Sequence, residues 1–576
     1  MNVIWLAIGG VVTVVAVATG SERLGLAAPL SFVVVGIALA FVPGVPRVAF
    51  DPKWILAGVL PPLLYASSVA MPANDFRRSF RPILRLAVLL VLLTTLVAAW
   101  LLHSLVAGLS WPTAFAVGAV ISPTDPVAAT AVGQRLGLPA RLLTMLEGEG
   151  LVNDASALVL LRASIAAMAA SVSLWGIAGK FAVSVMVAVA IGLAVGLASV
   201  RIRSKLNDPV LNSAVSFVVP FIVYLSADGI GASGVLAVVV TGLVSGYLGP
   251  RHLRAEDRLT ERANWRTAGF LLESGIFLIM GLELRPLIGG IQDGQFGPGR
   301  CLVLGLAMSA LVIVLRIGFT VPMVAGLRRE ERQRVAHAQP KLDALRTRLD
   351  DGDLEEELGD DRRRGLEKRF SRVDADVKYL VDQSVGWRGG AVLAWSGMRG
   401  AITVAAVQTL PADTPYRSQL VLIAFVVAAT TLFLQGATLP AVIKAAKVPG
   451  DDPEQFREEY GSLLHELSDS GQAALAGAQL SAEGQAGAGK GFDPLILARV
   501  RTDSLIRDEE EAQESPDPFF KSVREDYRRL RILVLKEQRL TLLADQSVGI
   551  YSSAALDKAQ RLLDREEITV RQLDPE

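Results

Sequence analysis

The strongest constraint in this sequence is a series of apolar segments, each long enough to cross a lipid bilayer. A hydrocarbon core of about 30 Å requires about 20 apolar residues in a helix. About thirteen such segments occur before residue 447, at residues 3–20, 27–44, 54–72, 83–104, 111–132, 141–166, 178–200, 209–227, 232–249, 267–288, 301–326, 387–409 and 418–444. No basic stretch precedes the first one, so we interpret it as a helix and not as a signal peptide. The sequence therefore predicts an all-α polytopic membrane protein.

Charged residues are scarce in these segments and concentrated elsewhere. Residues 328–384 hold 29 of the 114 charged side chains and residues 447–576 hold 43, so about 11% of the remaining residues are charged. Soluble domains average roughly 25%. Basic and acidic residues both number 57, and this balance gives no reason to expect nucleic acid as a partner. One cysteine, and four histidines without a HExxH pattern, exclude an intramolecular disulfide and a zinc-protease site. We expect no cofactor.

Basic residues alternate between the two sides of the predicted helices. With the N-terminus outside, the cytoplasmic connections receive Arg77, Arg78, Arg81, Arg85, Arg135, Arg141, Arg201, Arg203, Lys205, Arg251, Arg254, Arg258, Arg262, Arg328, Arg329, Lys444 and Lys447. The external connections receive only scattered charges, such as Lys180 and Arg417. The positive-inside rule therefore predicts an odd number of spans, an external N-terminus and a cytoplasmic C-terminus.

Four regions follow from this pattern. Residues 1–327 hold the predicted transmembrane helices 1–11, and residues 385–446 hold helices 12 and 13. Between them, residues 328–384 form a charged cytoplasmic insert, which we interpret as a solvated helical pair. Residues 447–576 form a cytoplasmic tail. In this tail, residues 470–492 are rich in Gly, Ala, Ser and Gln and suggest a linker, and residues 517–567 have helical spacing.

The fifth predicted helix contains an unusual polar stretch, SPTDPVAAT. Pro123 and Pro126 remove two backbone donors and disfavour the helical conformation of the residues before them. The helix should therefore break around Thr124 and Asp125. Asp125 lies about 21 Å along its helix, in the middle half of a bilayer. Broken helices near the midplane commonly form the cation sites of secondary transporters.

The sixth predicted helix contains LEGEGLVNDASALVL. Glu149 and Asn153 are four residues apart and share one face, and Asp154 follows about fourteen residues from the cytoplasmic end. Helices 5 and 6 are joined by a short loop, so Asp154 and Asp125 can reach the same depth. Ionisable residues inside a membrane are functional by default. Two aspartates beside a broken helix make a purely structural role less plausible.

The twelfth predicted helix carries an arginine between two glycines, in AWSGMRGAITVAAV. Arg399 lies deep in an apolar span and needs a carboxylate partner. The helix is expected to be interrupted at Gly397 and Gly400, as the inverted-repeat counterpart of helix 5.

Other charged residues in the spans are weaker signals. Among these, Arg162 and Arg316 could snorkel to the interface. Asp228 lies at the end of a helix, and Glu273 could face a cavity.

These motifs occur together in a known family. LPPLLYAS followed by DFRR, SPTDPVA, LEGEGLVNDASAL, GASGVLAVVVTGL, FLIMGLELRP and SGMRGAITVA appear in the order that is typical of monovalent cation:proton antiporters. The chain resembles bacterial NhaP-type antiporters and animal sodium/proton exchangers over about residues 1–446, apart from the insert. The resemblance implies a thirteen-helix fold with inverted repeats, a homodimer in the cell membrane, and exchange of Na⁺, or Li⁺ or K⁺, for protons.

The resemblance also assigns roles to particular residues. It implies that Asp154 is the shared carrier of cation and proton, with Asn153 beside it. It places Thr124 and Asp125 on the broken helix as further parts of the Na⁺ site, and it pairs Glu149 with Arg399. Two positions depart from the family pattern and each removes a possible oxygen ligand. Gly150 replaces a serine found in many members, and Ala66 replaces an acidic residue of animal members.

Competition between a proton and a cation for Asp154 explains exchange independently of the family resemblance. If only the two loaded states can cross, transport is obligatory exchange by alternating access. With neutral Asn153 before Asp154, one proton per cation makes the cycle electroneutral. Two other interpretations stay open. One is a cation channel or a membrane-bound sensor, and the other is an intramembrane enzyme with Asp125 and Asp154 as an aspartyl-type dyad.

Overall fold

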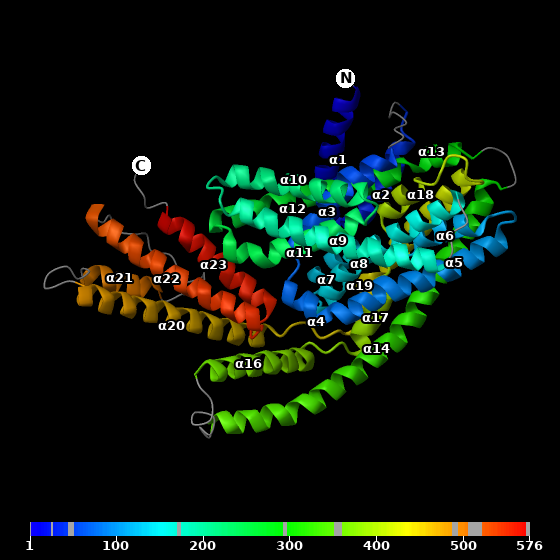
Figure 1. Ribbon diagram of the computed structural model, residues 1–576. Helices are drawn as coiled ribbons and strands as arrows, with labels where there is room; N and C mark the ends of the chain where they lie inside the picture. Colours follow the sequence, from blue (N-terminus) through cyan, green and yellow to red (C-terminus); the bar gives the residue numbers. More distant parts are fainter. Residues whose placement is uncertain are drawn as a thin grey trace. The chain divides into compact units, whose positions relative to one another are not determined.

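The structure is a computed structural model that consists of helices joined by short connections (Figure 1). It describes residues 2–24, 27–43, 51–169, 174–291, 296–350, 360–485, 494–504 and 521–571. No strand occurs in these ranges, which confirms the predicted all-α class. The chain divides into two compact units, which are described separately below.

The first unit comprises Met1–Gly249, Glu261–Glu330 and Gln383–Gly450. Its helices are α1 (Asn2–Leu24), α2 (Ala28–Ala40), η1 (Trp54–Val59), α3 (Leu60–Ala70), α4 (Ala73–Leu84), η2 (Arg85–Leu90), α5 (Val91–Leu105), α6 (Trp111–Ile121), α7 (Val127–Arg135), α8 (Ala140–Ala169), α9 (Leu174–Arg203), α10 (Pro209–Gly229), α11 (Gly234–His252), α12 (Ala255–Leu282), α13 (Leu284–Gly289), α14 (Pro298–Asp350), α17 (Trp387–Trp395), α18 (Ala401–Val407) and α19 (Arg417–Ala446). The end of α11, the start of α12 and the end of α14 belong to the second unit.

Eight helical stretches in the described residues are long and apolar enough to cross a membrane. They are Ala73–Leu105, Ala140–Met168, Phe181–Arg203, Pro209–Gly229, Gly234–His252, Ala255–Gly289, Pro298–Ala344 and Arg417–Ala446. The other predicted segments also form helices, but these are shorter or interrupted. The total of thirteen spans therefore stays a prediction.

One proline pair shapes a helix before the site. Pro61 and Pro62 start α3 directly after the π-helical turn η1. Proline has no N–H to donate, so the regular hydrogen-bond pattern shifts at this point.

Close helix packing elsewhere depends on glycine. A Cβ at Gly36 of α2 would lie 2.4 Å from the carbonyl oxygen of Leu278, and Gly281 of α12 approaches α2 equally closely.

The interrupted helices lie in the core of the first unit. Helix α6 packs against α5 and α8, α18 packs against α6 and α19, and α17 packs against α19. Their buried faces consist of small and aliphatic side chains, such as Ala116, Val117, Val404 and Ala405. Hydrophobic burial therefore holds both interrupted helices between continuous ones.

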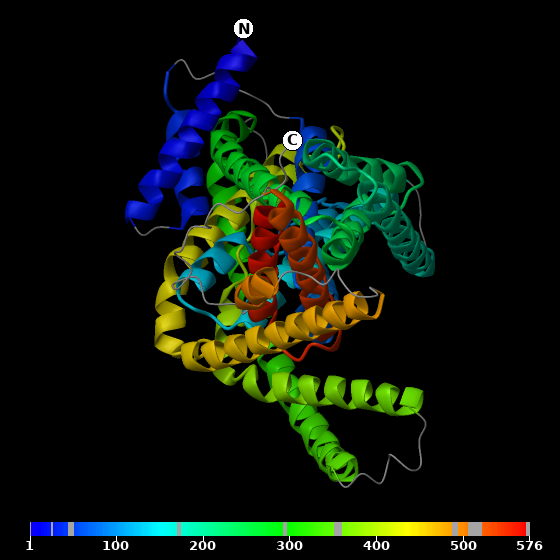
Figure 2. The same cartoon turned by 90° about the vertical axis from the view of Figure 1, so that its left-hand side faces the viewer.

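The second unit comprises Pro250–Thr260, Glu331–Asp382 and Asp451–Glu576. Its helices include α16 (Asp360–Asp382), α20 (Pro453–Gln485), α21 (Pro494–Ser504), α22 (Lys521–Val548) and α23 (Ser553–Arg571). Helices α20, α22 and α23 pack together, and Figures 1 and 2 show α22 beside α23 in both views. Leucines such as Leu463, Leu467 and Leu563 form their shared core.

Both described parts of the predicted insert are helical, as expected. The predicted linker at 470–492 is wrong for residues 470–485, which continue α20. Alanine, glutamine and leucine favour helices, and Leu475 is buried against Ile496 and Val500. The rest of the predicted linker lies outside the described residues.

Candidate functional site

Two interrupted helices form the centre of the candidate site. Helix α6 ends at Ile121 and α7 begins at Val127, with Pro123 and Pro126 in the interruption. Helix α17 ends at Trp395 and α18 begins at Ala401, with Gly397 and Gly400 in the interruption. The sequence predicted both interruptions, and both are observed.

The two interruptions contact each other directly. The backbone N–H of Asp125 donates a hydrogen bond to the carbonyl of Met398, at 2.7 Å. A Cβ at Gly400 would lie 2.0 Å from Oδ2 of Asp125, and a Cβ at Gly397 would lie 2.2 Å from Cδ of Arg316. Each of these glycines therefore leaves room for a charged side chain from another helix.

Asp125 and Arg399 lie where the interrupted helices leave backbone groups without helical partners. Oδ1 of Asp125 accepts a hydrogen bond from the N–H of Val127, at the start of α7. Nε of Arg399 donates to the carbonyl of Ile121, at the end of α6, and Nη1 donates to Gly397. A negative charge suits the N-terminus of a helix and a positive charge suits its C-terminus. The two side chains thus compensate opposite ends of the interrupted helices.

The partner of Glu149 differs from the predicted one. Both carboxylate oxygens of Glu149 accept hydrogen bonds from Arg316 of α14, with Nη2 at 2.9 Å from Oε2. The prediction that Glu149 pairs with Arg399 is therefore wrong. Arg399 instead donates to backbone carbonyls, and its own N–H donates to the hydroxyl of Thr431. Arg316 is fully buried and does not snorkel.

Thr124 and Asn153 connect α8 to the first interruption. The hydroxyl of Thr124 donates to Oε1 of Glu149 at 2.8 Å. Nδ2 of Asn153 donates to the carbonyl and the hydroxyl of Thr124, at 3.1 and 3.0 Å. These bonds hold the interrupted segment against α8. Oδ1 of Asn153 is buried and accepts no hydrogen bond from the residues that the structure describes.

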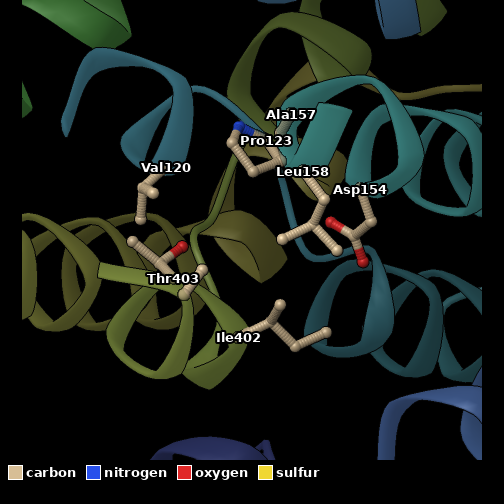
Figure 3. Close-up of a pocket in the computed structure, with 8 residues that line it drawn as sticks. Val120, Pro123, Asp154, Ala157, Leu158, Ile402 and Thr403 are labelled. Carbon is tan, nitrogen blue, oxygen red and sulfur yellow. The ribbon is translucent and has the colours of Figure 1, made fainter. Parts of the chain in front are cut away.

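Asp154 lines a small pocket between α8, the end of α6 with the first interruption, and α18. The lining residues are Val120, Pro123, Asp154, Ala157, Leu158, Ile402, Thr403 and Ala406 (Figure 3). The carboxylate of Asp154 makes no hydrogen bond or ion pair with the described residues. Asp125 is close enough to act on it electrostatically. The structure thus places Asp154 in a pocket beside Asp125, whereas Thr124, Asn153 and Glu149 form a separate bonded group.

The two departures from the family pattern have different surroundings. A Cβ at Gly150 would lie 2.4 Å from Cγ and Cδ of Pro126, so this position has no room for a side chain. Ala66 lies opposite Gly269 of α12. The weaker candidate Asp228 pairs with Arg162 at 2.5 Å. No group of three or more His, Cys, Asp or Glu side chains in the described ranges could hold a metal ion.

Comparisons with known proteins agree on one family. The family described as "Sodium/hydrogen exchanger, transmembrane" matches residues 10–445. An uncharacterised Na⁺/H⁺ exchanger of Mycobacterium tuberculosis is 28% identical over 98% of this chain and 96% of its own length. The Na⁺/H⁺ antiporter ApNhaP of Aphanothece halophytica is 26% identical over 76% of this chain and 72% of its own length.

A solved structure shows the same fold. The sodium proton antiporter from Methanocaldococcus jannaschii matches with a TM-score of 0.54 and 15% identity, over 77% of this chain and 98% of that one. The sequence match covers both interruptions and every residue of the site described above. The chain therefore belongs to the sodium/hydrogen exchanger family.

Proposed function

We propose that this protein is a secondary antiporter that exchanges a monovalent cation, Na⁺ in the first place, for H⁺ at Asp154. The observation that carries the proposal is the pocket in which the Asp154 carboxylate lies without a bonded partner among the described residues. Relatives that cover most of the chain are named Na⁺/H⁺ exchangers or antiporters.

The electrostatics of the site support exchange. A carboxylate away from water requires a compensating proton or cation. Asp154 lacks an arginine or lysine partner among the described residues, so its partner must be a proton or a cation from solution. Since one carboxylate cannot hold both at once, the two compete. Exchange follows if only the neutralised forms move between the two sides.

The charges around Asp154 also support an electroneutral cycle. Glu149 and Arg316 neutralise each other, and Asn153 carries no charge. One titratable carrier, Asp154, then takes one proton per cation. Asp125 is held at the start of α7 and beside Gly400, where it tunes the field at Asp154.

The assembly is proposed from the resemblance to the antiporter family, and the location and orientation from the helices and the basic residues. We propose a homodimer in the cell membrane, with an external N-terminus and a cytoplasmic C-terminus. The transmembrane-length helices support a membrane location. The basic residues of the predicted cytoplasmic connections support the orientation.

A proteoliposome assay tests the function. The purified protein is reconstituted with an acidic lumen and an internal pH dye, and Na⁺, Li⁺ or K⁺ is added outside. Exchange alkalinises the lumen at the same rate when the membrane potential is clamped at zero or at a negative value. A rate that follows the potential would indicate a channel or unequal charge exchange. Proteolysis of membrane peptides without cation-dependent alkalinisation would support the aspartyl-type enzyme.

A further inference from the structure

The Asp154 pocket contains one other lining residue with a side-chain oxygen, Thr403 of α18. The remaining lining residues are alanine, valine, leucine, isoleucine and proline. Figure 3 shows Thr403 and Asp154 on different sides of the group of labelled side chains, with Leu158 and Ile402 between them in this view. Thr403 is therefore the residue that brings a neutral side-chain oxygen to the pocket of Asp154.

The Thr403 hydroxyl is free to take a ligand. Threonine hydroxyls inside helices usually bond to a carbonyl of the preceding turn. Thr431 of α19 does so with Val427 at 2.8 Å, and Thr409, in the turn after α18, bonds in the same way to Ala406 at 2.6 Å. The backbone N–H of Thr403 donates to Gly400, but its hydroxyl makes no hydrogen bond with the described residues. The side chain is only 2% exposed.

On the facing helix α8, position 150 is a glycine and therefore offers no hydroxyl to a cation at Asp154. Gly150 is in contact with the ring of Pro126, and a side chain there would collide with it. The hydroxyl of Thr124 is engaged with Glu149 and Asn153. Thr403 thus supplies a free hydroxyl from the second interrupted helix.

We propose that Thr403 binds the transported cation together with Asp154 and helps to set which cation is preferred. Its hydroxyl oxygen binds the ion directly or through one water of the ion's hydration shell. Small alkali cations favour hard oxygen ligands, so Li⁺ and Na⁺ should depend on this oxygen more than K⁺. The proposal rests on the function proposed above and adds a cation ligand to it.

The test compares Thr403→Val, which keeps the shape and removes the hydroxyl, with Thr403→Ser, which keeps the hydroxyl. Thr403→Ala provides a second hydroxyl-free variant if valine is not tolerated. Thr409→Val is the matched control, because the Thr409 hydroxyl already donates to the carbonyl of Ala406. Exchange kinetics are measured in proteoliposomes for Na⁺, Li⁺ and K⁺. The rise of Tm with NaCl concentration is measured in detergent, because a ligand that binds the folded state stabilises it.

Thr403→Val should raise the apparent KM for Na⁺ and Li⁺ roughly tenfold, because it removes one ligand interaction. The apparent KM for K⁺ should rise by a smaller factor. The pH profile at saturating Na⁺ should match that of the parent, because the proton carrier is unchanged. Thr403→Ser should restore the KM, and Thr409→Val should leave it unchanged.

The proposal is overturned if Thr403→Val keeps the parent KM, or if Thr403→Ser is as impaired as Thr403→Val. The two proposals can fail separately. If the parent shows Na⁺-dependent stabilisation without exchange, the proposed function fails, and the NaCl dependence of Tm in Thr403→Val still decides the role of Thr403. If the parent shows neither, both proposals are overturned.

Discussion

Glu149 of α8 and Arg316 of α14 form a fully buried ion pair in which both carboxylate oxygens accept hydrogen bonds from one guanidinium group. Nε and Nη2 of Arg316 also donate to the carbonyl of Leu393, at 3.1 and 3.0 Å. The pair therefore ties α8 and α14 to the end of α17, next to the second interruption. The pair is electrically neutral, whereas the Asp154 carboxylate has no bonded partner among the described residues.

Removing one partner of this pair should destabilise the protein strongly. Glu149→Gln and Arg316→Gln each leave a buried charge uncompensated, at a cost of about 3–5 kcal/mol. The double variant should lose much less stability than the sum of the single variants, because neither charge is left alone. Urea unfolding in detergent measures all three. Arg85 and Glu330 form a partly exposed pair, and the same substitutions there should cost about 1 kcal/mol or less. Additive effects at Glu149 and Arg316 would contradict the pairing.

Asp154→Asn should abolish exchange and leave the protein folded. The amide keeps the volume of the side chain but can neither release a proton nor neutralise a cation. Proteoliposome exchange and size-exclusion chromatography check the two parts of this expectation. Glu330→Gln, which makes the same chemical change outside the pocket, should retain exchange. Normal Na⁺/H⁺ exchange in Asp154→Asn would remove Asp154 from the carrier role.

Much of the site could be predicted from local sequence. Two prolines around Thr124 and Asp125, and two glycines around Arg399, were sufficient to predict both interruptions, because these residues act on the backbone where they stand. The intramembrane aspartates could also be identified from the sequence, since a charged side chain in an apolar span is costly whatever its orientation.

The partners of these charges could not be predicted in the same way. Arg316 lies in an uninterrupted apolar helix, and nothing in its local sequence shows that it crosses the space left by Gly397 to reach Glu149. The local sequence favours Arg399 as the partner of Glu149, because Arg399 lies between glycines in an apolar span, but Arg399 donates to backbone carbonyls instead. Thr403 gave no signal, because a threonine in an apolar helix ordinarily bonds to its own backbone.

The two glycines beside Arg399 should be intolerant of alanine. Gly400→Ala would place Cβ against Asp125, and Gly397→Ala would place it against Arg316. Gly400→Ala should therefore reduce exchange, and Gly397→Ala should reduce stability as well by displacing the Glu149 pair. Gly318→Ala is the control, because a Cβ there meets nothing within 4 Å and alanine favours the helix. Exchange rate and Tm separate the effects, and parent-like behaviour of Gly400→Ala would contradict the close contact.

Cysteine labelling tests the proposed orientation. Cys301 is buried and is first replaced by serine. Single cysteines are then placed at Ser204, between α9 and α10, and at Asp413, between α18 and α19. A membrane-impermeant maleimide should label position 413 in intact cells and position 204 only after the cells are opened. The reverse pattern would show that the proposed orientation is inverted.

Asp545 of α22 should make the stability of the tail helices depend on pH. It is buried near Glu466 of α20, which accepts a hydrogen bond from Tyr551 at 2.7 Å. Burial, together with the Glu466 charge, raises the pKa of Asp545 to about 7, whereas the unfolded chain has an ordinary carboxyl pKa of about 3.9. Between these values the folded state binds more protons than the unfolded state, so stability falls as pH rises and levels off above about pH 7.

Asp545→Asn removes this titration, because the amide stays neutral at every pH. Hydrogen exchange of the α20 and α22 amides is compared between parent and variant at the same pH, which cancels the intrinsic exchange rate. The variant should be better protected than the parent at pH 8, where the parent carries the buried charge, and this difference should be smaller at pH 5, where less of the parent's stability has been lost. Asp557→Asn provides the control, since Asp557 is exposed and pairs with Arg561 within α23. Equal protection of Asp545→Asn and the parent at pH 8 would show that ionisation of Asp545 does not destabilise the tail helices.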